Sequence, residues 1–153
     1  LEAGDVGDLV EQVCAGLRAE EPTVPLRFRR ESGPALVVLP AVAFTQAVLN
    51  LIDNALEESS PEAPVEVDVS VTQDRVVVEV RDHGPGWPAL VRAHLGEPFV
   101  TTRPSGVGLG LYFAYTLAET VGGRLELDDT PGGGAIARLV LPVARDLRLQ
   151  GAA

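Results

Sequence analysis

The chain has 153 residues and a formal net charge of −10, and all twelve of its basic residues are arginines. Its hydrophobic content of 46% and charged content of 22% are typical of a globular protein, and its length predicts a single domain over 1–153. The acidic balance argues against a nucleic-acid surface, which needs a basic patch. Because Cys14 is the only cysteine, an internal disulfide and a cysteine-based metal cluster are excluded.

No apolar run reaches the roughly 18 residues that a membrane-spanning helix needs, and no signal-peptide pattern opens the chain. We therefore expect a cytoplasmic domain without direct membrane insertion, which is compatible with a parent protein anchored in the inner membrane. The chain begins at Leu1 and contains no methionine, so we expect it to be a segment of a longer protein.

Hydrophobic periodicity predicts three main helices and about six strands, in an order that favours an α+β layered sandwich. The expected helices are 5–19 with Asp5 as its cap, 40–59 beginning at Pro40, a short one near 87–94, and 109–121. The expected strands are 24–30, 35–39, 65–71, 75–81, 124–129 and 135–142. The third and fourth strands form one hairpin, and the last two form another.

The helix expected at 40–59 carries Asn50 and Asn54 four residues apart, so both lie on one helical face, with Gln46 one turn earlier. Asparagine is a poor helix former, and its amide can offer an oxygen to Mg²⁺ or an N–H to phosphate. The spacing is equally that of a solvated polar face.

Two glycine-containing motifs follow. The first is "DHGPG", in which Asp82 directly follows a strand and could accept a hydrogen bond from an exocyclic amine such as that of adenine; an ordinary turn has the same composition. The second is "GVGLGL" at 106–111, which supplies bare backbone amides at a helix start, a favourable site for an anion. It does not match the dinucleotide fingerprint, because Leu111 occupies the place of the third glycine, and it is not a Walker loop, because the chain has no lysine.

Taken together and in this order, the motifs resemble the catalytic and ATP-binding domain of two-component sensor histidine kinases, of the gyrase–chaperone–histidine kinase–mismatch repair ATPase superfamily. "NLIDNA" is similar to the N box, "DHGPG" to the first glycine box, "EPFVTT" to the F box and "GVGLGL" to the second glycine box. The resemblance covers about residues 5–143. It implies a two-layer α/β sandwich of the Bergerat type, in which a mixed sheet is covered by helices on one face.

The resemblance implies Mg²⁺ and ATP as the bound groups. Asn54 would coordinate the metal, and Asn50 would contact the phosphates or the metal shell. Asp82 would hold the adenine amino group, while Gly84 and Gly86 let the backbone close over the base.

The resemblance also implies roles for the segment between the two later boxes. Phe99 would anchor a lid over the nucleotide, and Thr102 and Arg103 would lie near the phosphates. The residues that would wrap the triphosphate at the helix start are Gly106, Gly108, Leu109, Gly110 and Leu111. The lid is short, so nucleotide exchange is expected to be fast.

Two positions depart from the family pattern. Glu57 stands where many members carry a basic residue, and Ala135 stands where a threonine often follows the glycines of the last hairpin. The first change removes an expected phosphate contact, and the second removes an expected contact near the adenine.

The resemblance implies transfer of the γ-phosphoryl group to a histidine on a separate dimerisation and phosphoacceptor domain, with a response regulator downstream and this domain monomeric by itself. Neither His83 nor His94 belongs to a long helix with the acceptor pattern. Two alternatives remain: a serine kinase of the anti-sigma-factor type, which usually has an acidic residue where this chain has Asn50, and a nucleotide-binding interaction module without transfer activity.

Overall fold

The computed structural model describes residues 1–100 and 108–145 as seven strands and four helices. The strands are β1 (Glu2–Asp5), β2 (Leu26–Arg30), β3 (Leu36–Leu39), β4 (Val65–Thr72), β5 (Arg75–Arg81), β6 (Arg124–Asp129) and β7 (Ala135–Pro142). The helices are α1 (Val6–Glu20), α2 (Ala41–Leu56), α3 (Ala89–Ala93) and α4 (Gly110–Thr120). No helix within these residues is both long and apolar enough to cross a membrane.

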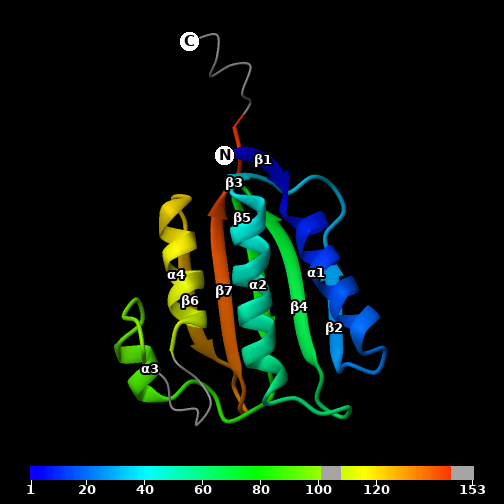
Figure 1. The fold of residues 1–153 in the computed structure, drawn as a ribbon, viewed down its shortest axis with the longest axis vertical. Helices are drawn as coiled ribbons and strands as arrows, with labels where there is room; N and C mark the ends of the chain where they lie inside the picture. Colours follow the sequence, from blue (N-terminus) through cyan, green and yellow to red (C-terminus); the bar gives the residue numbers. More distant parts are fainter. Residues whose placement is uncertain (101–107, 146–153) are drawn as a thin grey trace.

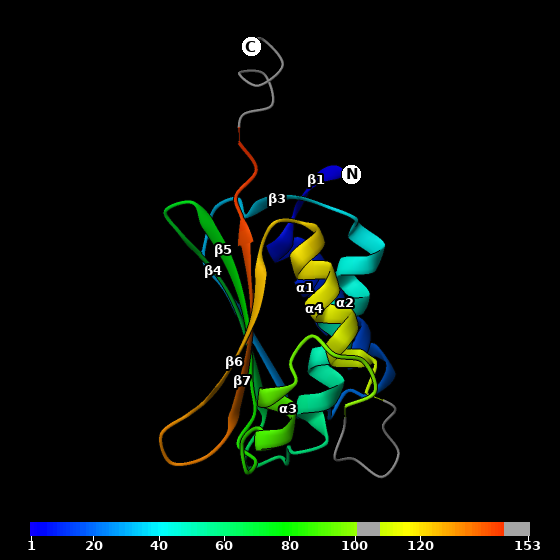
Figure 2. The ribbon, with the colours of Figure 1, turned by 90° about the vertical axis from the view of Figure 1, so that its left-hand side faces the viewer.

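Five strands form one mixed sheet in the order β2-β4-β5-β7-β6, in which β2 and β4 are parallel and the other pairs antiparallel. The long helices α1, α2 and α4 cover one face of this sheet, and Figure 2 shows the two layers edge-on. This arrangement confirms the expected two-layer sandwich with helices on one face. β1 and the end of β7 lie at one end of the molecule, and α3 lies at the other (Figure 1).

The core lies between the two layers and consists mainly of aliphatic side chains, with Phe44 and Cys14 among them. Successive residues of a strand point to opposite faces of the sheet, so alternate strand residues face this core. Val65, Val67 and Val69 of β4 are buried against the helices, as are Val76 and Val78 of β5. The other face carries ion pairs between neighbouring strands, such as Arg29–Asp68 at 2.8 Å and Arg138–Glu79 at 3.0 Å.

Three details differ from the sequence prediction. β1 was not predicted, because "EAGD" has no apolar alternation; it pairs with β3 in a separate two-stranded sheet. The strands on either side of the turn "ESGP" consequently belong to different sheets. α2 ends at Leu56 rather than near Ser59, because the chain then tightens into hydrogen bonds between residues three apart, such as Ser59 N–H to Leu56 O at 3.1 Å.

The helix boundaries follow from local capping. Asp5 precedes α1 and accepts a hydrogen bond from the Asp8 backbone N–H at 3.0 Å, as expected for an N-cap. α4 ends at a glycine pair: Gly122 has φ +82°, and the Gly123 N–H bonds back to Ala118 O at 2.8 Å. The predicted stop at this pair is confirmed.

Gly123→Ala is expected to destabilise the fold by at least about 2 kcal/mol, because a Cβ there would lie 2.2 Å from the backbone oxygen of Val140. The matched control is Gly16→Ala, in the middle of α1, where a Cβ meets nothing within 4 Å. Higher helix propensity should make this control more stable by about 0.5–1 kcal/mol. Urea unfolding measures both changes, and a Gly123→Ala protein as stable as the parent would contradict the steric argument.

Candidate functional site

Asn50 of α2 lies against the start of α4. Its side-chain Oδ1 accepts a hydrogen bond from Gln46 Nε2 at 2.9 Å, and its Nδ2 donates to the backbone oxygen of Gly110 at 3.4 Å. A Cβ on Gly110 would lie 3.6 Å from the Asn50 Cβ, so the two elements are in direct contact. Asn54 is half-buried one turn further along α2, on the same face as Asn50. Asn50 and Gly110 of the second glycine motif, 60 residues apart, therefore meet in space.

The start of α4 supplies further polar groups. Leu109 occupies the N-cap position and makes no side-chain capping bond to the amides of the first turn. Gly110 is the first helical residue, and Leu111 packs against the core. Backbone N–H groups of a first helical turn lack partners within the helix, and the dipole favours an anion beside them.

Asp82 directly follows β5 and is only 7% exposed, which makes it the one buried charged side chain in the described parts of the chain. Its Oδ1 accepts hydrogen bonds from the Gly84 N–H at 2.9 Å and the Ala135 N–H at 3.0 Å, while Oδ2 takes part in neither bond. The Asp82 backbone N–H also donates to Ala135 O at 2.9 Å. The carboxylate is thus held at a fixed orientation by two backbone donors.

The loss of a contact near the adenine at Ala135 stays a prediction. In the structure the backbone N–H of this residue holds Asp82, a role that needs no particular side chain. The neighbouring Gly134 has φ +113°, and a Cβ there would lie 2.4 Å from the Asp82 backbone oxygen. The run of three glycines at 132–134 was the signal in the sequence that a close backbone approach occurs here.

The first glycine motif lies between α2 and the last hairpin. A Cβ on Gly84 would lie 2.8 Å from the Cβ of Glu58, just beyond α2, and a Cβ on Gly86 would lie 2.7 Å from Asp129 Oδ1. Gly86 has φ +91°, a conformation that favours glycine. These contacts bring the loop of Asp82 to the end of α2 that carries Asn54.

Between α3 and α4, the described residues Phe99 and Gly108 are in backbone contact. The Phe99 N–H donates to Gly108 O at 3.1 Å, and a Cβ on Gly108 (φ +74°) would lie 2.4 Å from the Phe99 carbonyl carbon. The Phe99 side chain is 70% exposed, so the contact that it makes across this segment is a backbone one. Thr102, Arg103 and Gly106 lie outside the described residues.

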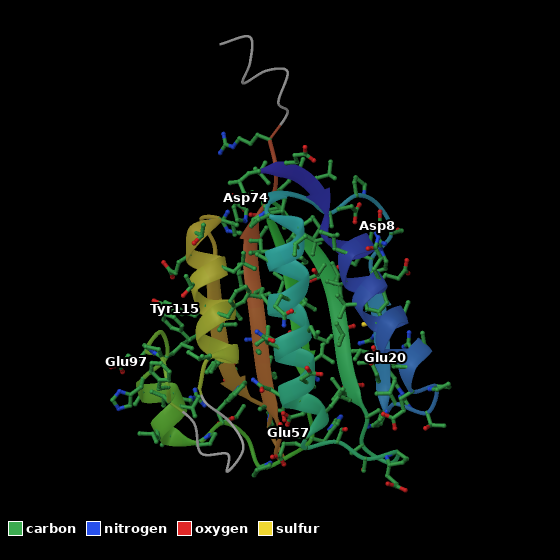
Figure 3. The ribbon with its side chains drawn as sticks, viewed as in Figure 1. Asp8, Glu20, Glu57, Asp74, Glu97 and Tyr115 are labelled. Atoms are coloured by element: carbon green, nitrogen blue, oxygen red, sulfur yellow. The ribbon has the colours of Figure 1, made fainter. Side chains whose placement is uncertain are left out.

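Gly96 joins this segment to α4, since a Cβ on it would lie 2.9 Å from the ring of Tyr115. Figure 3 labels Tyr115 on α4 and, beside α3, Glu97. The segment therefore starts from a position fixed against α4.

Carboxylates surround the C-terminal end of α2, where Figure 3 labels Glu57. The pKa of Asp53 is raised above its usual range, first by burial and then by the negative charges of Glu57 and Glu20. Within residues 1–100 and 108–145, no group of three or more His, Cys, Asp or Glu side chains could hold a metal ion.

The sequence analysis did not identify the residues beyond the first glycine motif that hold it in place. The Trp87 backbone N–H donates to Asp129 Oδ1 at 2.9 Å, and its indole Nε1–H donates to Ile136 O at 2.8 Å. Arg92 Nη1 lies 2.7 Å from Asp129 Oδ2. Nothing in the local pattern of "LDDT" distinguishes Asp129 from an ordinary residue at a strand end.

The model of one protein family, described as "Histidine kinase-, DNA gyrase B-, and HSP90-like ATPase", matches residues 40–145. Sensor protein FixL of Bradyrhizobium diazoefficiens is 37% identical over 141 residues, which are 89% of this chain. The chain spans only 28% of the length of FixL.

Two solved structures share the fold. The mycobacterial sensor histidine kinase MprB is similar with a TM-score of 0.77 and 27% identity, over 92% of this chain and 96% of that one. Full-length ShkA, solved in complex with AMPPNP, is similar with a TM-score of 0.77 and 28% identity. That match covers 95% of this chain and 32% of ShkA.

Proposed function

Because the chain belongs to the histidine kinase-, DNA gyrase B- and HSP90-like ATPase family, and is an ATPase domain of the two-component sensor type, we propose that it binds Mg-ATP. We propose further that it donates the γ-phosphoryl group to a histidine on a separate helical domain. The P–O bond to the leaving ADP breaks, and a P–N bond to the imidazole forms. A response regulator is the expected downstream partner, and the cytoplasm is the expected location.

The observation that carries the proposal is the buried carboxylate of Asp82. A buried charge needs partners, and here two backbone N–H groups orient it through Oδ1 alone. Oδ2 can then accept a hydrogen bond from the exocyclic amino group of adenine. Guanine has a carbonyl oxygen at the corresponding position, which would repel the carboxylate. The pocket should therefore select adenine nucleotides.

The phosphates fit between α2 and the start of α4. Asn50 lies 3.4 Å from the first residue of α4, and the amides of that helix start provide donors suited to a triphosphate. Asn54, on the same face of α2, has the amide oxygen that a magnesium ion accepts as a ligand. Magnesium supplies neutralisation of the phosphate charge, the main requirement of phosphoryl transfer. Thr102 and Arg103 remain predicted phosphate contacts.

Neither described histidine has the setting of a phosphoacceptor. His83 lies in the loop after β5, with its Nε2 3.6 Å from Glu66 Oε2. His94 follows the five-residue helix α3, and its Nδ1 contacts Glu97. Neither imidazole lies on a long helix of the kind expected to carry the acceptor, which supports a proposal in which the acceptor histidine comes from another domain.

Calorimetric titration tests the nucleotide half of the proposal. Mg-ADP should bind in the micromolar range, more weakly in EDTA, and at least about 100-fold more tightly than Mg-GDP, because the guanine carbonyl leaves the buried Asp82 without a donor. Equal affinity for Mg-ADP and Mg-GDP would show that Asp82 does not recognise the base. Absence of ADP binding by a folded sample would overturn the proposal as a whole.

Transfer is tested with γ-labelled ATP, Mg²⁺ and a helical phosphoacceptor domain, in parallel with the same domain whose acceptor histidine is replaced by glutamine. The label should appear only on the first domain and should be labile to acid and stable to base. Label that resists acid would indicate a serine kinase, and an unlabelled acceptor despite ADP binding would leave a nucleotide-binding module.

A further inference from the structure

We propose that Asp129 is a positioning residue of the nucleotide site, which holds the glycine loop 84–88 and helix α3 in place from the end of strand β6. The inference rests on the proposed function, since it concerns the same pocket. In this proposal Asp129 acts through the loop and α3 and does not touch the nucleotide.

The carboxylate of Asp129 joins three segments. Its Oδ1 accepts the Trp87 backbone N–H at 2.9 Å, and its Oδ2 accepts Arg92 Nη1 at 2.7 Å. A Cβ on Gly86 would lie 2.7 Å from the same Oδ1, so the loop backbone packs directly on the carboxylate. Trp87 belongs to the loop, Arg92 to α3 and Asp129 to β6, and one side chain therefore fixes all three.

Asp82 and Asp129 hold opposite ends of the loop from one hairpin. Asp129 pairs with Ala135 across β6 and β7, and the Ala135 N–H donates to Asp82 Oδ1 at 3.0 Å. The Trp87 indole adds a bond to the next residue of β7, Ile136. The loop that follows Asp82 is thereby attached to the hairpin at its beginning and at its end.

Helix α3 depends on this attachment more than a longer helix would. It has five residues, of which only Val91 is buried. Both side chains of the Arg92–Asp129 pair are more than 40% exposed, so their attraction alone stabilises the fold little. The effect of the pair is on position, because residues 94–100 follow α3 directly and Gly96 among them packs on the ring of Tyr115 in α4.

The experiment compares Asp129→Ala, Asp129→Asn and Arg92→Gln with the parent chain. The expected loss of Mg-ADP affinity is about tenfold for Asp129→Ala, the size usual for residues that orient a site without touching the ligand. Asp129→Asn keeps an acceptor for the Trp87 N–H and loses the charge opposite Arg92, so its loss should be smaller and close to that of Arg92→Gln.

The matched control is Asp128→Asn, one residue earlier in β6. Its Oδ2 lies 3.5 Å from Arg138 on the other face of the sheet, and the charge change is the same. Its Oδ1 accepts the Asp129 backbone N–H at 2.9 Å, which the amide oxygen of asparagine can also do. Its affinity for Mg-ADP should stay within about twofold of the parent.

Trp87 is the only tryptophan, so its fluorescence reports on the loop without labelling. In Asp129→Ala, acrylamide should quench Trp87 more strongly than in the parent when nucleotide is absent. At saturating Mg-ADP the two should become similar, because the ligand then orders the loop that Asp129 ordered before. Circular dichroism of the nucleotide-free variant should match that of the parent, because saturating ligand would also reverse a general loss of stability.

Unchanged affinity in both Asp129→Ala and Arg92→Gln, with a parent chain that binds Mg-ADP, overturns the inference and leaves the proposed function intact. Equal losses in Asp128→Asn and Asp129→Asn would also overturn it, since the effect would then be one of net charge. If Asp129→Ala does not fold, Asp129→Asn and Arg92→Gln decide. A parent chain without nucleotide affinity overturns the proposed function and the inference together.

Discussion

Asp82→Asn is expected to weaken Mg-ADP binding about 100-fold and to leave the fold intact. The amide oxygen can still accept the N–H groups of Gly84 and Ala135, which Oδ1 accepts now. The second oxygen is replaced by an NH₂ group, which meets the adenine amino group donor to donor. A hydrogen bond to a charged acceptor contributes roughly 1.5–3 kcal/mol, and each 1.4 kcal/mol is a factor of ten in affinity.

Calorimetry with Mg-ADP measures the loss, and circular dichroism checks the fold. The matched control is Asp68→Asn on the neighbouring strand β4, which removes an equal charge from the open face of the sheet, where Asp68 pairs with Arg29 at 2.8 Å. This control should bind like the parent. Retention of full affinity by Asp82→Asn would show that the carboxylate serves only to hold the loop.

Most of the fold could be predicted because its elements carry their own signals. The alternation in β4 and β5, the apolar periodicity of α1 and the glycine pair after α4 are local patterns, and the structure confirms each of them. β1 could not be predicted in this way. Its four residues include Gly4 and two acids, and its pairing with β3 is a tertiary contact across more than 30 residues.

The candidate site likewise has features that local sequence motifs predict and contacts that only the fold creates. Asn50, Asp82 and the glycines around 84–86 and 108–110 stand in motifs, so they could be proposed as a site before their arrangement was known. The contact between Asn50 and Gly110 and the packing of Glu58 on Gly84 depend on how the layers meet. Ala135 could not be recognised from its side chain, because it contributes a backbone N–H to Asp82 and any residue other than proline has this group.

Glu57 matters also through its negative charge. The sequence analysis took it as a lost phosphate contact. In the structure, burial raises the pKa of Asp53, and the negative charge of Glu57 raises it further. An acidic helix end beside the proposed phosphate position repels a bare triphosphate and tolerates a magnesium-bound one better. We therefore expect nucleotide affinity in this chain to depend strongly on magnesium, and Asn54 is the residue through which that dependence should act.

Asn54→Ala is expected to remove the magnesium dependence of nucleotide binding. The amide oxygen of Asn54 is the one proposed metal ligand that the chain itself provides, and its loss should weaken Mg-ATP binding about 100-fold. Binding of ADP in EDTA should change by less than about twofold, because Asp82 and the glycine loop hold the base without the metal. Transfer to the helical phosphoacceptor domain should fall at least as much as Mg-ATP affinity.

The ratio of dissociation constants in EDTA and in Mg²⁺ is the decisive quantity, since it cancels any general effect on the fold. Thr45→Ala is the matched control: it lies on the same helix, and its hydroxyl donates to Val42 O within α2 at 2.9 Å. This control should keep the parent ratio. If Asn54→Ala also keeps it, the metal is held by the phosphates and other groups, and the role of the asparagine pair reduces to the contact that Asn50 makes with the start of α4.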